Sequence, residues 1–459
     1  GYTFLGWSTT KDGAVEYLDE AEYVMGEEPS VTLYAVWQAN EYTISMDPQN
    51  GDLSTSQKVV YNSPYKFFVP IRKGYKFDGW FTQKGGNDSR LTDSEGNSIQ
   101  NWNKVGNITI YANWLGTDGI LYTEKDTTYT VSGVSDKTIT EAYIPEYYNG
   151  KLVTTIGGNA FAGCNQLSDI FVQKTIQTIE KGAFSGCSAL TRLVVPFVGE
   201  SRTATQEKGL LTYWFGQDSA ENTEEIYQFF LGEDGFDQTY SAYVPLSLAN
   251  IKVFDTTRIP YGAFSYMSKL QNVSFDGVSE IEERAFEYAT GISTFDLPDT
   301  LKSIGANAFA HTSIKDITIP SSVQSIGEGI FAGCKALAEM KIPFVGQSAE
   351  ATEYNAVLGW LFGQNNYDGM TATTQGSWTS YISAALKTVE ITNASTVPEY
   401  AFANIKTLKN VVLANTSTKI KDNAFRGCTG LTNIDLHLIS TIGGSAFYEC
   451  SGLTSANLE

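Results

Sequence analysis

The chain has 459 residues, of which 42% are apolar, so it can bury a large core and is too apolar to be disordered. Its 31 Lys and Arg residues stand against 51 Asp and Glu residues, which gives a net charge of −20. The cations do not cluster, which argues against nucleic acid and against an anionic membrane surface as partners. No stretch approaches the ~20 apolar residues of a spanning helix, so we expect no membrane insertion.

The N-terminal segment, 1–117, contains a motif that occurs twice. The segment GYTFLGW (1–7) recurs as GYKFDGW (74–80), and YAVW (34–37) recurs as YANW (111–114). Alternating apolar residues in 42–46 and the turn dipeptide Asn50-Gly51 indicate a small β-rich module. We predict the C-terminal half of such a module over 1–40 and a complete module over 41–117. Four tryptophans in register are expected in the module cores: Trp7, Trp37, Trp80 and Trp114.

The next segment, 118–150, reads as a β-rich connection. Residues 120–131 and 138–144 have the alternation of strands. We expect them to cap the open N-terminal edge of the repeat array that follows, because an exposed strand edge invites aggregation.

A repeat with a period of about 22 residues dominates 151–459. Its template is I-x-x-x-A-F-x-x-C-x-x-L-x-x-I-x-V-P, with the Phe at 161, 184, 264, 286, 309, 331, 402, 425 and 447. The I-x-V piece predicts one short strand per coil, and strands that recur in this way must lie parallel. The A-F-x-x-C piece suits one helical or 3₁₀ turn on the opposite side. The predicted fold class is therefore α+β: a solenoid with a parallel sheet and short helical turns.

Two steps of the repeat are longer. The strand centres Val194 and Lys252 lie more than two repeat lengths apart, and so do Lys341 and Glu390. The extra residues form insertions at about 197–247 and 347–385, and these resemble each other: PFVG (196–199) and FGQ (215–217) recur at 343–346 and 362–364. We expect both insertions to flank the solenoid without breaking its strand ladder.

These motifs resemble two families. The A-F-x-x-C repeats, the PFVG and FG insertions and the lead-in IPEYYNGK (144–151) are similar to BspA-type leucine-rich-repeat surface proteins over about 120–459. The G-Y-x-F-x-G-W and Y-A-x-W motifs resemble the Listeria–Bacteroides repeat of internalin-type adhesins. The resemblance implies β-grasp-like N-terminal modules that act as a stalk, and a secreted or cell-surface bacterial protein. Some BspA-type proteins attach to host proteins such as fibronectin and fibrinogen, and neither family carries catalytic residues.

The cysteines are the first candidates for chemistry. All five lie three residues after a repeat Phe: Cys164, Cys187, Cys334, Cys428 and Cys450. Other coils carry Met267, Ala289, Thr312 and Ile405 at that position, so the Cys is predicted to pack there as a small hydrophobe. A disulfide between stacked coils, Cys164–Cys187 or Cys428–Cys450, is the alternative that spacing alone permits.

Catalysis and metal binding find little support. The two histidines, His311 and His437, lie in no nucleophile motif, and a single Cys per coil cannot supply a zinc site. The adjacent carboxylates Glu224-Glu225 and Glu282-Glu283 point apart rather than into one cleft, so they do not predict glycoside hydrolysis. We expect no enzyme, no cofactor and no metal.

Two groups of residues are candidates for ligand binding. The strand centres carry no repeated chemistry, which suits recognition of a protein better than a carbohydrate or calcium ladder. Aromatic residues in the insertions are possible anchors, although docking of the insertions onto the core is the favoured interpretation. The candidates are Phe171, Lys252, Asp296, Lys341, Glu390, Asp435, Tyr213, Trp214 and Trp360.

The sequence therefore predicts an extracellular or cell-surface protein that acts as an adhesin or interaction protein. Its expected ligand is another protein, with host extracellular-matrix proteins as the candidates. A structural spacer without a ligand is the alternative, and a glycan- or peptide-cleaving enzyme is the weaker one.

Overall fold

The computed structural model describes residues 1–26, 30–86, 89–414 and 418–457. The chain forms two compact units. The first contains Gly1–Asp118, Asp126–Tyr129 and Pro145–Val153; the second contains Gly119–Lys125, Thr130–Ile144 and Thr154–Glu459. Strands β8 (Thr128–Val134) and β11 (Lys151–Ile156) contribute residues to both, and β7 (Ile120–Lys125) belongs to the second. Among the described residues, no helix is long and apolar enough to cross a membrane.

The first unit contains one complete module. Strands β3 (Glu41–Asp47), β4 (Thr55–Val60), β5 (Lys76–Phe81) and β6 (Ile108–Leu115) form a sheet in the order β4-β3-β6-β5. The central pair β3 and β6 is parallel and the outer pairs are antiparallel. Because side chains alternate along a strand, Ile44 and Met46 point to one face, where they join a core with Trp80 and Trp114.

A two-stranded element precedes this module. Strands β1 (Tyr2–Ser8) and β2 (Tyr34–Ala39) pair antiparallel, with a register shift between Phe4 and Gly6. The β5–β6 pair has the same shift between Phe77 and Gly79, so β1–β2 reproduces that half of the module. The expected β-grasp fold is not supported, since the described residues of both elements contain no helix. The connection between β4 and β5, 61–75, is where the helix of a β-grasp would run, and it contains turns and no helix.

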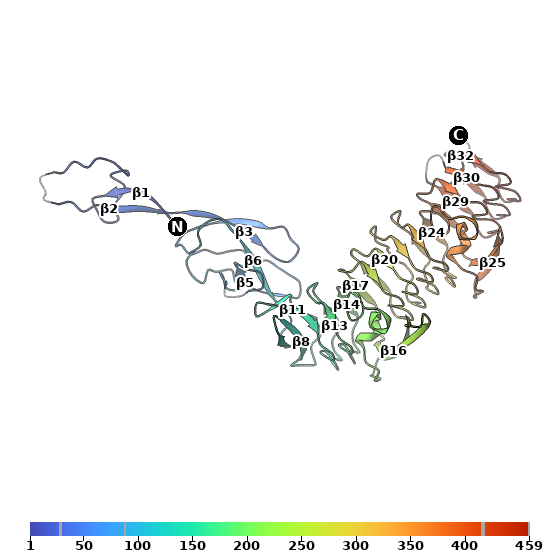
Figure 1. The fold of residues 1–459 in the computed structure, drawn as a ribbon, viewed down its shortest axis with the longest axis horizontal. Helices are drawn as coiled ribbons and strands as arrows, with labels where there is room; N and C mark the ends of the chain where they lie inside the picture. Colours follow the sequence, from blue (N-terminus) through green and yellow to red (C-terminus); the bar gives the residue numbers. More distant parts are fainter. Residues whose placement is uncertain (27–29, 87–88, 415–417, 458–459) are drawn as a thin grey trace. The chain divides into compact units, whose positions relative to one another are not determined.

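The second unit is a solenoid whose coils stack in chain order (Figure 1). A parallel ladder follows the predicted strand centres, so that Phe171, Val194, Lys252 and Ser274 lie side by side. The first five strands are β9 (Glu141–Tyr143), β12 (Asp169–Phe171), β14 (Arg192–Val195), β17 (Asn250–Val253) and β19 (Asn272–Phe275). The next six are β22 (Asp316–Thr318), β24 (Glu339–Ile342), β27 (Thr388–Ile391), β29 (Asn410–Leu413), β31 (Asn433–Asp435) and β33 (Ser455–Asn457). The predicted register is confirmed within each of these two sheets, including across both long steps. The predicted strand centre Asp296 lies between them and forms only an isolated β-bridge with Thr318.

A second parallel ladder, which the sequence did not predict, precedes the Ala-Phe turns. Its strands are very short, and their apolar members, such as Ile281, Ile304 and Ile326, are stacked and buried. The last residues of β11 pair with β13 (Thr178–Ile179). The other strands are β18 (Arg258–Ile259), β20 (Glu280–Ile281), β21 (Ser303–Ile304), β23 (Ser325–Ile326), β28 (Thr396–Val397), β30 (Thr418–Ile420) and β32 (Ile439–Ile442).

The prediction of helical turns is wrong, and so is the predicted α+β fold class. The Ala-Phe segments are hydrogen-bonded turns, as in Cys164 N–H to Phe161 O at 3.1 Å, and the only described helices are four 3₁₀ segments in the insertions. Each turn has two left-handed residues four positions apart, and a left-handed residue ends a right-handed helix. These pairs are Asn159/Gly163, Gly182/Gly186, Gly262/Tyr266, Arg284/Tyr288, Asn307/His311, Gly329/Gly333, Tyr400/Asn404, Asn423/Gly427 and Ser445/Glu449. The fold is a β-solenoid.

Each insertion is itself an enlarged coil. The first contains η1 (Gln206–Gly209), η2 (Leu211–Trp214) and the hairpin of β15 (Thr223–Leu231) and β16 (Asp237–Pro245). The second contains η3 (Glu353–Ala356), η4 (Leu358–Leu361), β25 (Met370–Gln375) and β26 (Trp378–Ser383). The segment η2 takes the place of an Ala-Phe turn, because Phe184 N–H bonds to Trp214 O and Leu211 N–H to Ala263 O. The hairpins are the added part.

Candidate functional site

One buried glutamine fastens each insertion to the solenoid. In the first insertion, the side-chain oxygen of Gln228 accepts the N–H of Thr212 at 2.9 Å, and its amide donates to the carbonyl of Ala263 at 2.9 Å. Gln375 is its counterpart in the second insertion, accepting from Gly359 at 2.8 Å and donating to Ala401 at 2.6 Å. Both amides are buried and fully used. The two insertions therefore share one construction.

The three aromatic candidates of the insertions are all hydrogen-bonded within the protein. Trp214 is completely buried, and its indole N–H donates to Gly199 O at 2.8 Å. Tyr213 is also buried, which raises its pKa to about 12, and its hydroxyl donates to a Glu200 oxygen at 3.1 Å. The indole of Trp360 donates to Ile326 O at 2.9 Å. Trp214 also packs edge-on to Phe184 of the solenoid, and Trp360 bonds to a coil carbonyl, whereas the partner of Tyr213 lies within the first insertion itself.

In the first insertion, a side chain bridges the gap between the insertion and the following coils. Arg258 donates to the carbonyl of Ala204 at 3.2 Å and pairs with Glu282 at 2.8 Å. Burial raises the pKa of the Glu282 carboxyl, and the Arg258 charge opposes this shift. The guanidinium thus links the insertion to the coil, beside a recess of about 400 Å³ that Arg202, Thr203 and Arg258 line.

A second arginine, Arg284, holds the hairpin of the first insertion against the solenoid. Arg284 pairs with Asp237 of β16 at 2.8 Å and with Glu287 at 2.5 Å, and its guanidinium lies over the ring of Phe229 of β15 at 5.0 Å. Burial raises the pKa of Glu287, although the hydrogen bond from Arg284 acts against it. The counterpart of Arg284 after the second insertion is Asn423, which cannot make these ion pairs.

The second insertion has a cleft between the residues that correspond to the two contacts of Arg258 in the first. The counterparts of Ala204, Arg258 and Glu282 are Ala351, Thr396 and Lys421. Ala351 and Lys421 line a cleft of about 390 Å³ between the insertion and the coils after it, and Thr396 is shorter than the Arg258 that links their counterparts. The lining side chains include Thr352, Glu353, Ser377, Pro398, Glu399, Tyr400 and Lys421.

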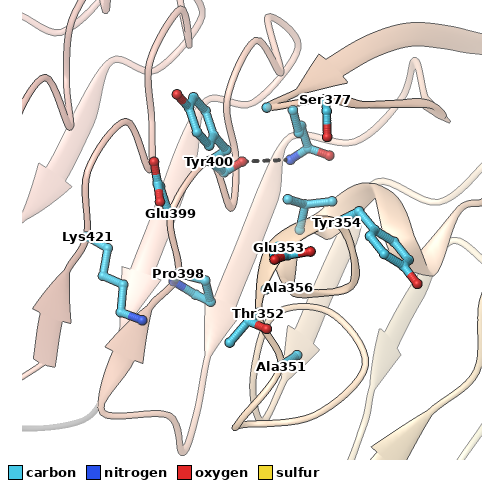
Figure 2. Close-up of a pocket in the computed structure, with 13 residues that line it drawn as sticks. Ala351, Thr352, Glu353, Tyr354, Ala356, Ser377, Pro398, Glu399, Tyr400 and Lys421 are labelled. Atoms are coloured by element: carbon cyan, nitrogen blue, oxygen red, sulfur yellow. Dashed lines mark hydrogen bonds between the residues drawn. The ribbon is translucent and has the colours of Figure 1, made fainter.

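The charged groups of the cleft face it from opposite walls. Figure 2 shows Glu399 and Lys421 on the coil side and Thr352 and Glu353 on the η3 side. All three charged residues are exposed. The ring of Tyr354 lies on the far side of η3 from Lys421, where it stacks on Trp378 with centroids 5.0 Å apart. The cleft is therefore a mixed polar recess, with carboxylates and an ammonium group available to a partner.

A row of aromatic rings runs between the two insertions. Phe229 of the first hairpin contacts Tyr266 at 5.3 Å, Tyr266 stacks on Tyr288 at 4.7 Å, and Tyr288 stacks on His311 at 4.1 Å. Tyr367 of the second insertion closes the row, edge-on to His311 at 4.3 Å. These rings cover one another's faces. The row therefore joins the two insertions and does not offer open ring faces to a ligand.

The strand-centre candidates lie in one line on the exposed side of the long ladder. Lys341 and Glu390 are neighbours and form an ion pair at 2.9 Å, while Lys252 pairs with Asp276 at 2.7 Å. Phe171 stacks on Tyr143 at 4.2 Å and lies below the guanidinium of Arg192. Asp296 forms an isolated β-bridge with Thr318. The side chain of Asp435 accepts a hydrogen bond from the backbone N–H of His437. The cleft and this line are separate surfaces.

The cysteines are packing residues, as predicted. All five are free, and each thiol that follows another coil points to the carbonyl of the preceding Phe, as in Cys334 to Phe309 O at 3.1 Å. Burial raises the pKa of Cys334 to about 11, which makes its reactive thiolate scarce. Among residues that the structure describes, no group of three His, Cys, Asp or Glu side chains is placed to hold a metal ion.

Among the residues that line the cleft, Glu353, Glu399, Tyr400 and Lys421 were not predicted from the sequence. The resemblance between the two insertions contained a signal that could have identified these residues. Aligning them shows that Arg258 and Glu282 are replaced by Thr396 and Lys421, and Tyr261 and Gly262 by Glu399 and Tyr400, although the flanking Pro and Ala-Phe residues are kept.

The comparisons with known proteins agree with both resemblances. The Listeria-Bacteroides repeat domain matches residues 1–36 and 42–113. A Gly-rich membrane protein of Evansella cellulosilytica is 33% identical over 119 residues, which are 25% of this chain and 12% of that protein's length. The chain therefore corresponds to a small part of this relative.

Two solved structures are similar. One is a leucine-rich repeat protein from Bacteroides ovatus (20% identity, TM-score 0.29, 74% of this chain and 94% of that one). The other is a leucine-rich cell surface protein from Faecalibacterium prausnitzii (19% identity, TM-score 0.34, 75% of this chain and 94% of that one). The BspA-type leucine-rich-repeat region matches in six copies over 135–202, 241–354 and 378–459, which is more than half of the residues. The chain belongs to the BspA-type leucine-rich-repeat family.

Proposed function

We propose that this chain is part of a secreted or cell-surface bacterial protein that binds other proteins, including host extracellular-matrix proteins, and that it is not an enzyme. The observation that carries the proposal is the cleft beside the second insertion. Two insertions share one construction, but only the first has the Arg258 bridge across its gap. The second has Thr396 and an open recess with Glu353, Glu399 and Lys421 on its walls.

The chemistry of the cleft suits a polypeptide. Exposed groups of both signs can meet side chains of a partner and the N–H and C=O groups of its backbone, and charge complementarity of this kind gives specificity. A recess of about 390 Å³ accommodates one or two side chains rather than a folded domain. The line of strand centres, with Phe171, Lys252, Asp296, Lys341, Glu390 and Asp435, is proposed as a second contact surface, separate from the cleft.

Binding to immobilised fibronectin and fibrinogen tests the function. We expect saturable binding of the purified chain to at least one of them, and weaker binding by the charge-reversed variant Glu399→Lys. Lys302→Glu, a charge reversal at an exposed lysine outside the cleft, is the matched control. Absence of saturable binding to both proteins would favour the spacer alternative. Turnover of a glycan or peptide library by the chain would contradict the non-enzymatic assignment.

A further inference from the structure

Three aromatic side chains of the second insertion lie together at the surface, and we call them the aromatic cluster. Tyr354 of η3 stacks on Trp378 of β26, with ring centroids 5.0 Å apart. The ring of Trp360 of η4 lies 6.1 Å from that of Tyr354 and 6.3 Å from that of Trp378. Tyr354 has 46% of its surface accessible, and both tryptophans are partly exposed. The ring of Tyr354 points away from Lys421 and the cleft (Figure 2).

The first insertion has a cation at the corresponding place. Tyr240 of its hairpin is the counterpart of Trp378, because each pairs across its hairpin with the buried glutamine of its insertion. The ammonium group of Lys181 lies over the ring of Tyr240, 5.2 Å from the ring centroid. A cation in this position is attracted by the negative face of the ring. The first insertion thus shows which kind of group this surface accepts.

In the second insertion, Glu328 takes the place of Lys181. The residue after each of them donates its backbone N–H to the carbonyl of the counterparts Tyr213 and Trp360, at 3.0 and 2.8 Å. Glu328 also lies close to the aromatic cluster, because the indole of Trp360 donates to Ile326 O, two residues before Glu328. Burial raises the pKa of the Glu328 carboxyl, and no cation in the described part of the chain pairs with it. A partly buried carboxylate of this kind is stabilised when a cation binds beside it.

We propose that the aromatic cluster and Glu328 bind a lysine side chain of a protein partner. The ammonium group pairs with the Glu328 carboxylate and lies against the rings, and the aliphatic stem packs along them. Tryptophan attracts a cation more strongly than tyrosine does, so the change from Tyr240 to Trp378 strengthens the site. That the ligand belongs to a protein rests on the proposed function, whereas the preference for an ammonium group follows from Lys181 and Glu328.

Titration of the chain with Nα-acetyl-lysinamide tests the site. The tryptophan indoles are isotope-labelled for NMR, and the signal of Trp378 is identified by its loss in Trp378→Phe. We expect a saturable shift of this signal, and no shift with Nα-acetyl-norleucinamide, which has an apolar stem without the charge. Glu328→Lys restores the lysine of the first insertion and should weaken binding about tenfold. Glu339→Lys makes the same charge change at an exposed residue of the same coil and should bind like the parent.

A second variant guards against a folding defect in Glu328→Lys. Glu328→Gln keeps the size of the side chain and removes its charge, so it should weaken binding about threefold. The inference is overturned if the lysine probe causes no saturable shift, or if the norleucine probe shifts the signal equally. It is also overturned if both Glu328 variants bind like the parent. A lysine-dependent shift in a chain that binds neither fibronectin nor fibrinogen would support the site and contradict only the proposed partners.

Discussion

The phenol ring of Tyr288 stacks on the imidazole of His311 with centroids 4.1 Å apart and planes 3° from parallel, although both residues have a left-handed backbone. At the same repeat position, four other coils have glycine: Gly163, Gly186, Gly333 and Gly427. A non-glycine residue at such a position costs about 1 kcal/mol. The stacking energy of the row offsets this cost.

The backbone cost and the stacking energy can be separated at Tyr288. Tyr288→Ala removes the ring and keeps the left-handed strain, so we expect it to destabilise the solenoid by ~2 kcal/mol. Tyr288→Gly removes the ring and the strain, and should be less harmful by about 1 kcal/mol. The midpoint of urea unfolding measures both. Equal midpoints, or a more stable Ala variant, would contradict the assignment of strain.

The imidazole of His311 predicts a dependence of stability on pH. Burial lowers the pKa of His311, so the unfolded chain binds a proton at a higher pH than the folded one. The stabilisation is therefore present above the unfolded value, ~6.5, and is lost as the pH falls through the folded pKa. His311→Phe keeps a ring in the row without a proton to bind. Its unfolding midpoint should change less between pH 7.5 and 5.5 than that of the parent, and an identical change would count against this role.

The buried amide of Gln375 predicts a specific loss on replacement. Gln375→Glu keeps the acceptor for Gly359 N–H but removes the donor to Ala401 O and buries a carboxylate, so we expect destabilisation by ~2–3 kcal/mol. Gln228→Glu should behave in the same way in the first insertion. Replacement of the exposed Gln364 by Glu is the control and should change the unfolding midpoint little. Similar unfolding midpoints for all three variants would contradict the role of Gln228 and Gln375 in holding the insertions on the solenoid.

The cysteines predict the outcome of a thiol titration. In the folded chain at pH 8, the completely buried thiols of Cys187, Cys334 and Cys428 should not react with an aromatic disulfide reagent, because burial raises their pKa. Cys450 is only partly buried and should react first. In denaturant, all five thiols of the chain should titrate. Three thiols instead of five would indicate a disulfide between stacked coils.

Much of the solenoid could be predicted from the sequence because its apolar residues recur with a regular period. The register of Val194 and Lys252 across the first insertion follows from the flanking apolar residues, which must point to the core in every coil. The second ladder has strands as short as Ser303–Ile304, and a strand of this length carries no detectable period. The prediction of helical turns was wrong because Tyr266 and Tyr288 give no sequence signal of the left-handed conformation that every one of these turns adopts at this position.

The cleft could not be predicted from composition or motifs, because it arises from a difference between two similar places. Arg258 and Thr396 become equivalent only when the shorter hairpin of the second insertion is allowed for in the alignment. Whether an arginine reaches across a gap depends on the distance between insertion and coil, which the structure supplies. The aromatic residues Trp214 and Trp360, which are conspicuous in the sequence, hold the insertions in place.

The most direct test of the proposed binding site transplants the bridge of the first insertion into the second. The double variant Thr396→Arg, Lys421→Glu recreates the pair of Arg258 and Glu282, with the carbonyl of Ala351 in the place of Ala204. Binding to immobilised fibronectin and fibrinogen is measured for this variant, for the parent and for Lys302→Glu. We predict that the closed cleft lowers affinity at least tenfold without lowering the unfolding midpoint, while Lys302→Glu binds like the parent. Undiminished binding by the double variant would contradict the account.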